Sequence, residues 1–352
     1  MEILMAEKVI VDLGERSYDI LIGAGVRELA QSGSMLITDS NIEEFYGSWC
    51  GKLAPVKYVF PAGEENKTIQ TIAAMCSCAA QNRLDRKSTM IALGGGVCGD
   101  MTGFAAAIYM RGIDFVQIPT SLLAMVDSSV GGKTAVDIPE GKNLIGAFHQ
   151  PRKVLIDTDF LKTLPLKEIR CGLAEIIKTG VILDEKLFAE LEKEPDTLTV
   201  SPDFQRYTPI IKRCCELKAQ VVAADEKEGG IRAILNYGHT FGHAFELLSD
   251  FKISHGEGVA LGMCAAGEYA VLDNRWSREE AQRQKYLIAA LGLPTELTVH
   301  YDTGEVIQAM LGDKKSASGK INLVLPTRIG HAEIVKNASI EKIAKAVESI
   351  YA

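Results

Sequence analysis

The chain has 352 residues, which exceeds the size at which a single hydrophobic core usually stops growing, so we expect two domains. Apolar residues make up 47% and charged residues 24%, which is the balance of a globular protein and not of a disordered or fibrous one. The formal net charge of -8 argues against a nucleic-acid surface, because such binding relies on Lys and Arg side chains that neutralise phosphates. A small anionic substrate, held by a few local cations, is compatible with this charge.

The first residues, MEILMAEKVIVDLGE, mix acidic residues and a lysine with apolar ones, so they lack the basic start and unbroken apolar core of a signal peptide. No stretch reaches the roughly 18 apolar residues that a membrane helix needs. We therefore expect a cytoplasmic protein with no membrane partner. The eight cysteines form no CxxC pair and lie mostly in apolar surroundings, so reduced and buried thiols are expected.

Residues 1–158 have the pattern of strands that alternate with helices. Two apolar runs, 8–13 and 18–23, flank a turn with a glycine and predict a hairpin. Further strands are expected at the short, often β-branched runs 34–39, 56–60, 88–96, 114–120 and 153–158. Amphipathic stretches of helical length separate several of these runs, for example 68–81. This alternation predicts a doubly wound, Rossmann-like α/β domain whose ligand sites lie beyond the carboxyl ends of the strands.

Residues 159–352 have longer helical periods and are expected to form a second, mainly α-helical domain. Helices are expected over 173–183, 203–225, 236–248, 256–272, 277–291 and 340–350. One strand-like run, 320–326, interrupts them. We place the domain boundary at residue 158.

A glycine-rich turn, IALGGGVCGD, follows a predicted strand and precedes an apolar, Ala-rich helical stretch. Gly94, Gly96 and Gly99 satisfy the spacing G-x-G-x-x-G, which lets backbone N–H groups approach a pyrophosphate at a helix N-terminus. A purely structural strand-to-helix turn is the alternative. No acidic residue about twenty positions later stands out as a ribose ligand.

The segment DSSVGGKT resembles the end of a P-loop, but Asp127 stands where that motif requires its first glycine, so the NTPase interpretation fails. Gly131 and Gly132 still permit a tight turn that presents Lys133 to a phosphate or carboxylate. A solvated surface lysine is an equally good interpretation of this segment alone.

His239 and His243 are four residues apart and would lie on one helical face, as two zinc ligands do in H-E-x-x-H. A catalytic zinc needs a third protein ligand, for which His255 and Glu175 are candidates. Each of these side chains alone could instead be buried and hydrogen-bonded for structural reasons. Three histidines within seventeen residues favour a metal site.

Lys218, Arg232 and Asn236 precede these histidines. Cations beside a metal indicate an anionic substrate, because guanidinium offers paired donors to phosphate or carboxylate. The alternative is a charged helical surface, which suits Arg232 poorly because it precedes the apolar run AIL.

The blocks PAGEENK, ALGGGVCGDMTGFAAAIYMRGIDFVQIPTSLLAMVDSSVGGKTAVD, GKNLIGAFHQP, GLAEIIKTG, RAILNYGHTFGHAFE, HGEGVALGM and DKKSASGKINLVL occur in this order. Over nearly its whole length the chain resembles 3-dehydroquinate synthase. The resemblance implies an N-terminal NAD-binding domain, a helical C-terminal domain, an active site between them and a homodimer. It also implies a divalent metal, zinc in most members, with cobalt as the alternative.

The reaction implied by the resemblance converts a phosphorylated sugar acid, 3-deoxy-D-arabino-heptulosonate 7-phosphate, to 3-dehydroquinate and phosphate in the shikimate pathway. It proceeds through oxidation by NAD, phosphate elimination, re-reduction and intramolecular aldol closure. The cofactor is regenerated in each cycle.

The resemblance also implies roles for individual residues. The metal ligands are expected at Glu175, His239 and His255, while His243 contacts the substrate. Substrate contacts are implied for Arg111, Asp127, Lys133, Lys142, Asn143, Lys178, Lys218, Arg232 and Asn236, and for one lysine of DKK, Lys314 or Lys315. NAD contacts are implied for Asp39, Glu64, Lys67, Gly94, Gly95, Gly96, Val97, Gly99, Asp100, Thr120 and Ser121, with Asp127 and Lys142 near the cofactor. Glu246 is expected to support the site or the fold and not to bind the metal.

Three alternative functions remain. One is a related sugar-phosphate cyclase such as 2-epi-5-epi-valiolone synthase, although the residues at Asn236, His243 and Lys314/Lys315 are of the dehydroquinate type. The second is a metal-dependent polyol dehydrogenase with net NADH production. The third is a regulatory protein that binds metal and NAD without turnover.

Overall fold

The computed structural model describes residues 6–312 and 320–351. Contacts divide the chain into unit 1, Met1–Leu164 with Tyr207–Lys227, and unit 2, Pro165–Arg206 with Glu228–Ala352. These units differ from the two continuous stretches expected from the sequence in one respect, because residues 207–227 belong to unit 1. The domain boundary at residue 158 stays a prediction.

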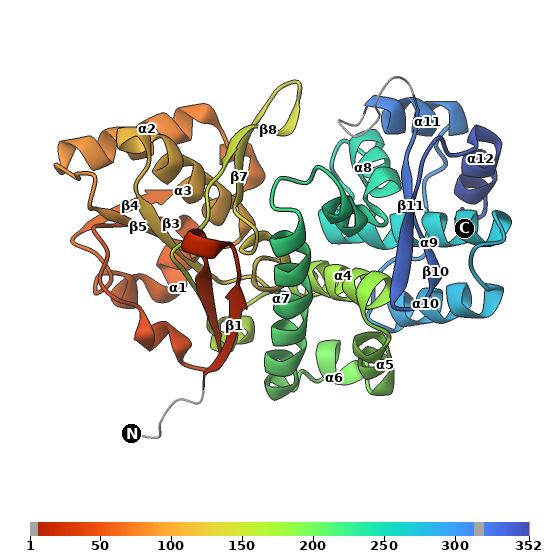
Figure 1. Cartoon of the computed structure of the whole chain (residues 1–352), viewed down its shortest axis with the longest axis horizontal. Helices are drawn as coiled ribbons and strands as arrows, with labels where there is room; N and C mark the ends of the chain where they lie inside the picture. Colours follow the sequence, from red (N-terminus) through yellow and green to blue (C-terminus); the bar gives the residue numbers. More distant parts are fainter. Residues whose placement is uncertain (1–5, 313–319, 352) are drawn as a thin grey trace. The chain divides into compact units, whose positions relative to one another are not determined.

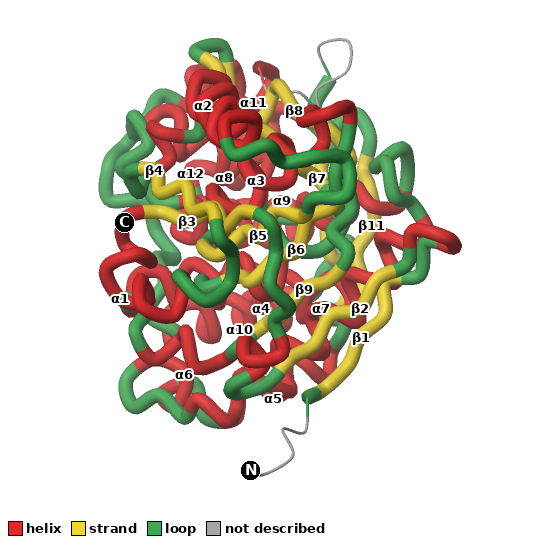
Figure 2. Tube along the Cα trace, turned by 90° about the vertical axis from the view of Figure 1, so that its left-hand side faces the viewer, coloured by secondary structure: helices red, strands yellow, loops and turns green. Residues whose placement is uncertain are grey.

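Unit 1 is built on a seven-stranded sheet with the order β1-β2-β9-β6-β5-β3-β4 (Figure 2). Its strands are β1 (Glu7–Val11), β2 (Tyr18–Ile22), β3 (Met35–Asp39), β4 (Val56–Phe60), β5 (Thr89–Gly94), β6 (Asp114–Pro119) and β9 (Lys153–Ile156). β1 and β2 pair antiparallel, which confirms the predicted hairpin. The other neighbours pair parallel, which confirms the predicted α/β class of the N-terminal part.

The helices of unit 1 are α1 (Ser40–Cys50), α2 (Ile69–Gln81), α3 (Gly96–Ile108) and α7 (Tyr207–Ala224). A continuous apolar core joins β3 and β5 to α2 and α3, with fully buried side chains such as Ile37, Met75, Met90 and Met101. Such burial is expected of parallel strands, whose two faces are both covered.

Helix α7 packs on β1 and on the turn of helix at Ala124–Ser128. Its Cys215 thiol lies 3.4 Å from the carbonyl oxygen of Met125, and Lys212 forms a 2.6 Å ion pair with Glu7. These contacts explain why α7 belongs to unit 1 although it follows residue 158 by almost fifty positions.

A second hairpin of unit 1, β7 (Lys133–Ile138) and β8 (Gly141–Phe148), was not predicted. The glycines at 131 and 132 indicate only a turn there. β7 packs against α3, and Gly146 of β8 lies so close to β7 that an added Cβ would be 2.1 Å from the carbonyl oxygen of Thr134. Glycine at this position therefore allows the two strands to pair closely.

Unit 2 is mainly helical, as predicted (Figure 1). Its helices are α4 (Leu166–Leu183), α5 (Glu185–Lys193), α6 (Asp196–Thr199), α8 (His239–Leu248), α9 (His255–Leu272), α10 (Arg278–Ala290), α11 (Thr303–Gly312) and α12 (Ile340–Glu348). β10 (Leu323–Arg328) overlaps the predicted strand at 320–326 and pairs antiparallel with β11 (His331–Val335), which was not predicted. Helix α9, most of whose residues are buried, packs against α4, α8, α10 and α12.

Glycines let α8 and α9 approach to backbone contact. A Cβ added to Gly262 would lie 1.9 Å from the carbonyl oxygen of Gly238, and one added to Gly242 would lie 2.6 Å from that of Gly258. Glycine in the interior of a helix destabilises the fold by roughly 0.5–1 kcal/mol relative to alanine. Here glycine is needed because the two backbones are in close contact. The crossing fixes the first residues of both helices, His239 and His255, near each other.

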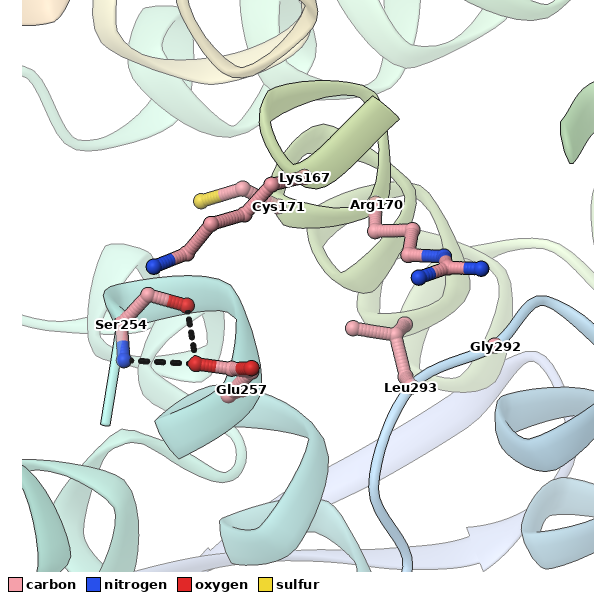
Figure 3. Close-up of a pocket in the computed structure, with 7 residues that line it drawn as sticks. All are labelled: Lys167, Arg170, Cys171, Ser254, Glu257, Gly292 and Leu293. Atoms are coloured by element: carbon pink, nitrogen blue, oxygen red, sulfur yellow. Dashed lines mark hydrogen bonds between the residues drawn. The ribbon is translucent and has the colours of Figure 1, made fainter. Parts of the chain in front are cut away.

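The start of α9 is fixed by a capping box between Ser254 and Glu257. The carboxylate of Glu257 accepts hydrogen bonds from the Ser254 N–H at 2.8 Å and from its hydroxyl at 2.6 Å, next to a small pocket that Lys167, Arg170 and Cys171 help to line (Figure 3). Such reciprocal capping sets the entry of the chain into a helix. It therefore orients His255, the first residue of α9.

Within residues 6–312 and 320–351, no helix combines the length and apolarity that crossing a membrane requires. The eight cysteines form no disulfide, and Cys76 and Cys78 are the two that are not fully buried, as predicted for reduced thiols.

Candidate active site

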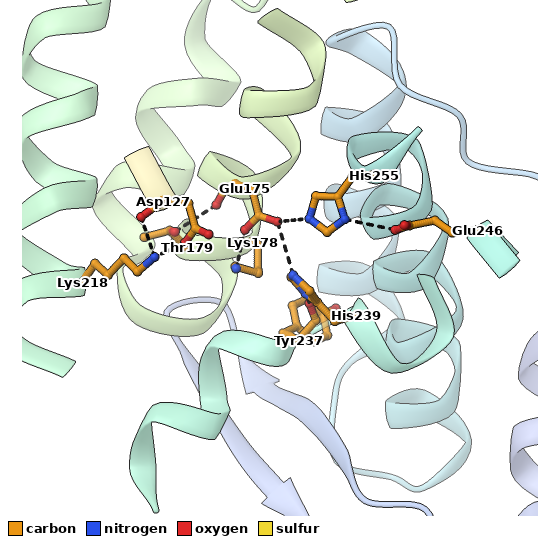
Figure 4. Close-up of polar contacts among 9 residues, drawn as sticks. All are labelled: Asp127, Glu175, Lys178, Thr179, Lys218, Tyr237, His239, Glu246 and His255. Carbon is orange, nitrogen blue, oxygen red and sulfur yellow. Dashed lines mark hydrogen bonds and ion pairs between the residues drawn. The ribbon is translucent and has the colours of Figure 1, made fainter. Parts of the chain in front are cut away.

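Three side chains that can ligate a metal converge in unit 2 (Figure 4). Glu175 comes from the middle of α4, and His239 and His255 begin α8 and α9. Nε2 of His239 lies 3.5 Å from Glu175 Oε1, and Nε2 of His255 lies 3.4 Å from the same oxygen. These are the residues implied by the family resemblance, and the structure brings them together. Their role as ligands stays a prediction.

Glu175 is 1% exposed, and Oε2 of its carboxylate forms an ion pair with the Lys178 ammonium. Burial raises the pKa of this carboxyl, but the Lys178 ammonium one turn along α4, with His255, outweighs burial and lowers the pKa to about 2. The group is therefore an ionised carboxylate in a buried position. The Lys178 ammonium pairs with Oε2, whereas Oε1 faces both histidine rings and is the oxygen that suits a divalent metal.

The two histidine rings are oriented by bonds at their other nitrogen. Nδ1 of His239 donates to the backbone carbonyl of Tyr237 at 3.1 Å, and Nδ1 of His255 donates to Oε1 of Glu246 at 3.0 Å. These bonds place the proton on Nδ1 and turn Nε2 toward Glu175. Two imidazoles and one carboxylate form the three-ligand set of a catalytic divalent-metal site, which leaves further positions for substrate oxygens.

His255 lies between two carboxylates. Burial lowers the pKa of this imidazole, but Glu175 and Glu246 outweigh burial and raise the pKa to about 10. The two carboxylates beside the His255 ring therefore favour a positive charge at this place.

His243 lies one turn after His239, and their ring centroids are 5.4 Å apart. A second possible ligand group consists of His243, Glu246 and His255, whose ligand atoms also lie within 4.8 Å of one another. In that group the Nδ1 atom of His255 already donates to Glu246. The group with Glu175 uses the Nε2 atoms and includes the buried carboxylate, so it fits a metal better.

Other predicted substrate residues of unit 2 are Lys178 and Arg232, which are buried, and Asn236, which is half-buried. Lys178 and Arg232 are each 2% exposed. The amide of Asn236 donates to Oε1 of Glu228 at 3.0 Å. Glu228 was not predicted from the sequence, because it lies in the acidic run DEKEGG, which resembles a solvated surface. In the structure its φ of +57° indicates that its backbone is held in an uncommon conformation.

The predicted NAD residues of unit 1 follow the carboxyl ends of neighbouring parallel strands. Asp39 ends β3, Glu64 and Lys67 follow β4, the Gly94–Asp100 turn joins β5 to α3, and Thr120 and Ser121 follow β6. Helix α3 has Gly95 as its N-cap and no side-chain cap, so its first N–H groups remain available to an anion. This edge therefore fits the pyrophosphate of a dinucleotide, although contact with NAD stays a prediction.

Lys67 connects a predicted cofactor residue with a predicted substrate residue. Its ammonium donates to Oδ2 of Asp100 at 2.7 Å and to Oδ1 of Asn143 at 2.6 Å, and the Lys67 side chain is 4% exposed. Burial raises the pKa of Asp100 in spite of the Lys67 ammonium. Asn143 has φ +54° and donates its N–H to Asp137 at 2.7 Å, so its position is held from both sides.

Asp127 and Lys218 form a pair within unit 1. The Lys218 ammonium donates to Oδ1 and to the carbonyl oxygen of Asp127, both at 2.6 Å. Asp127 lies in a π-helical turn, a feature that is frequent at functional sites.

The remaining predicted substrate residues of unit 1 are more accessible. Lys133 and Arg111 are exposed and Lys142 is half-buried, and Arg111 has φ +66°. Lys314 and Lys315 lie outside the described residues.

Comparison with solved structures supports the assigned fold. A 2-deoxy-scyllo-inosose synthase complexed with carbaglucose-6-phosphate, NAD⁺ and Co²⁺ has a TM-score of 0.86 at 27% identity, covering 97% of this chain and 100% of that chain. The 2-epi-5-epi-valiolone synthase of Streptomyces hygroscopicus subsp. jinggangensis, with NAD⁺ and Zn²⁺ bound, has a TM-score of 0.87 at 26% identity, covering 96% of this chain and 98% of that chain.

Comparison of sequences is more specific. The 3-dehydroquinate synthase of Nostoc punctiforme is 46% identical over 98% of this chain and 100% of the relative. The family models for the 3-dehydroquinate synthase N-terminal and C-terminal regions match residues 57–171 and 172–316. The chain therefore belongs to the 3-dehydroquinate synthase family.

Proposed function

We propose that this protein converts 3-deoxy-D-arabino-heptulosonate 7-phosphate to 3-dehydroquinate and phosphate, as an NAD- and metal-dependent, phosphate-eliminating cyclase. The observation that carries the proposal is 46% identity over the full length of a 3-dehydroquinate synthase, against 26–27% to the cyclases that act on other sugar phosphates. The convergence of Glu175, His239 and His255 in unit 2 supports a metal-dependent reaction.

Glu175, His239 and His255 would hold the divalent metal. Zinc is the metal of one structural neighbour and cobalt that of another, so either ion suits a site of this kind. When bound, NAD would take up and return a hydride, while the metal would polarise vicinal substrate oxygens. We infer that the strand edge of unit 1 with the Gly94–Asp100 turn binds NAD.

The chain's own cations would bind and orient the substrate. Phosphate and carboxylate are recognised by lysine and arginine through charge-assisted hydrogen bonds, which are strongest where water is excluded. Lys178 and Arg232 in unit 2 meet this condition through their burial. The further substrate residues proposed are Arg111, Asp127, Lys133, Lys142, Asn143, Lys218, Asn236 and His243, with Lys314 or Lys315.

Asp127 would help to hold the Lys218 ammonium in place, because that ammonium donates twice to Asp127. Lys67 would hold Asn143 in the same way. We further infer a homodimer in the cytoplasm, on the family resemblance alone; light scattering of the purified protein tests the dimer.

The decisive experiment supplies the metal-loaded protein with catalytic NAD and the heptulosonate phosphate, and follows phosphate and dehydroquinate together. Both products should appear in equal amounts without accumulation of NADH, and a chelator should abolish both. Net NADH production would identify a polyol dehydrogenase instead. Turnover of a hexose phosphate or of another heptulose phosphate, with none of the heptulosonate, would identify one of the related cyclases. Binding of NAD and metal without any turnover would identify a regulatory protein.

A further inference from the structure

Glu246 is a buried carboxylate that contacts a predicted metal ligand from behind. Its side chain comes from the third turn of α8 and the residue is 4% exposed. Oε1 of Glu246 accepts a hydrogen bond from Nδ1 of His255 at 3.0 Å, and Nε2 of the same ring lies 3.4 Å from Glu175 (Figure 4). Glu246 thus holds Nδ1 of the His255 imidazole, and Nε2 of the same ring faces Glu175.

The packing of α8 against α9 fixes the Glu246 side chain. Gly258, one turn into α9, lies so close that an added Cβ would be 2.9 Å from both Cγ and Oε1 of Glu246. The backbone carbonyl of Glu246 accepts from the Phe251 N–H at 2.8 Å and from the Ser249 hydroxyl at 2.9 Å. The carboxylate therefore has little freedom to leave His255.

The two histidines differ in the group that holds them. His239 is oriented by the backbone carbonyl of Tyr237, whereas His255 is oriented by a side chain. A carboxylate behind a metal-bound histidine sets the tautomer and raises the basicity of the ring, and its loss typically weakens metal binding 10–100-fold. The carboxylate behind His255 can therefore be removed by substitution, whereas the backbone carbonyl behind His239 cannot.

We propose that Glu246 is a positioning residue that holds His255 so that Nε2 points to the metal. This inference rests on the metal site proposed above. In this role Glu246 would act through His255 and would not itself be a metal ligand.

The test measures the dissociation constants of Zn²⁺ and Co²⁺ in competition with a chelator, without substrate, for the parent chain, Glu246→Gln and Glu246→Ala. Glu246→Ala should bind each metal about 10–100-fold more weakly and change the visible absorption of bound Co²⁺. Glu246→Gln keeps the size of the side chain and an oxygen acceptor, so it should lose less affinity. Circular dichroism and the Tm of each apoprotein report on folding, and Glu246→Gln serves as the test if Glu246→Ala does not fold.

Ser249→Ala is the matched control. The Ser249 hydroxyl donates to the Glu246 carbonyl and accepts from the Ile253 N–H at 3.1 Å, but it does not touch the carboxylate. Ser249→Ala should lower the Tm by roughly 2–4 °C while the metal affinity stays within about twofold. Loss of stability and loss of metal affinity can thereby be separated.

Two results would overturn the positioning role. A folded Glu246→Ala protein that binds metal within about twofold of the parent would show that His255 needs no support. Loss of binding as complete as that in Glu175→Ala would make Glu246 a ligand, as in the group with His243. Absence of metal binding by the parent chain would refute the metal site itself, whereas a parent that binds metal but makes no dehydroquinate would refute the proposed reaction and leave this test intact.

Discussion

Gly262→Ala should separate α8 from α9 and thereby disrupt the proposed metal site. The added Cβ would meet only backbone, at 1.9 Å from the Gly238 carbonyl oxygen and 2.8 Å from the Gly242 nitrogen. An ordinary contact of about 3.4 Å requires the helices to move apart by about 1.5 Å, because backbone atoms cannot rotate away as a side chain does. Overpacking of this kind typically lowers the free energy of unfolding by roughly 1–3 kcal/mol.

The same movement acts on the ligands, since His239 directly follows Gly238 in the chain. Metal–nitrogen distances near 2.1 Å tolerate errors of only about 0.2 Å, so a displacement above 1 Å removes one ligand from the set. We expect the dissociation constant for Zn²⁺ to rise at least about 100-fold. Chelator competition measures this constant, and urea unfolding of the apoprotein measures the stability.

Gly267→Ala is the control on the same helix. Its added Cβ would meet side-chain atoms, at 3.1 Å from Trp276 and 3.3 Å from Gln284, which need to shift by only a few tenths of an ångström. We expect metal affinity within about twofold of the parent and a stability change within about 1 kcal/mol. If Gly262→Ala keeps both the parent stability and the parent metal affinity, the helix crossing does not position the site.

Three further changes test other parts of the structure. Glu175→Ala should abolish metal binding, measured as bound zinc per chain, and phosphate release should fall with it; a full complement of zinc would contradict the ligand role. Lys67→Met should lower the free energy of unfolding by roughly 1–3 kcal/mol in a urea titration, because it leaves the half-buried Asp100 carboxylate without its cation. An unchanged urea midpoint would refute that pairing. The pKa of Asp273 is lowered mainly by its hydrogen bond from Lys342, so the stability from this pair is present above about pH 4 and lost as the pH falls further. Unfolding between pH 5 and 3 should therefore show a steeper loss for the parent than for Asp273→Asn, and equal slopes would show that the pair contributes nothing.

The layered fold was largely predictable, because short β-branched runs and glycine-rich turns are local signals. The assignment of α7 was not predictable in the same way. Its periodicity shows a helix, but the partner of that helix is set by contacts such as Lys212 with Glu7, which are about two hundred residues apart in the chain. The hairpin of β7 and β8 was missed because its pairing depends on the close approach at Gly146, for which sequence spacing has no signal.

The proposed metal site shows the same limit of prediction from sequence at a smaller scale. Four-residue spacing places His239 and His243 on one helical face, but it cannot decide which of them meets a third ligand. That choice depends on where α4 places Glu175, whose local signal was a carboxylate within an apolar helix, GLAEIIK. The structure distinguishes the two histidines by the direction of Nε2 of His239, which faces Glu175 at 3.5 Å.

Glu246 and Gly262 together would hold the proposed metal site, which is made from three distant segments, in place before any ion binds. The glycine crossing sets the distance between the first residues of α8 and α9, and the carboxylate then sets the rotation of the His255 ring within that distance. The glycine crossing alone leaves the rotation of the His255 ring undetermined, since a fixed backbone does not determine which ring nitrogen faces inward. Substituting Gly262 and Glu246 together should therefore weaken metal binding less than the product of the two single effects, because a displaced ring gains nothing from its carboxylate.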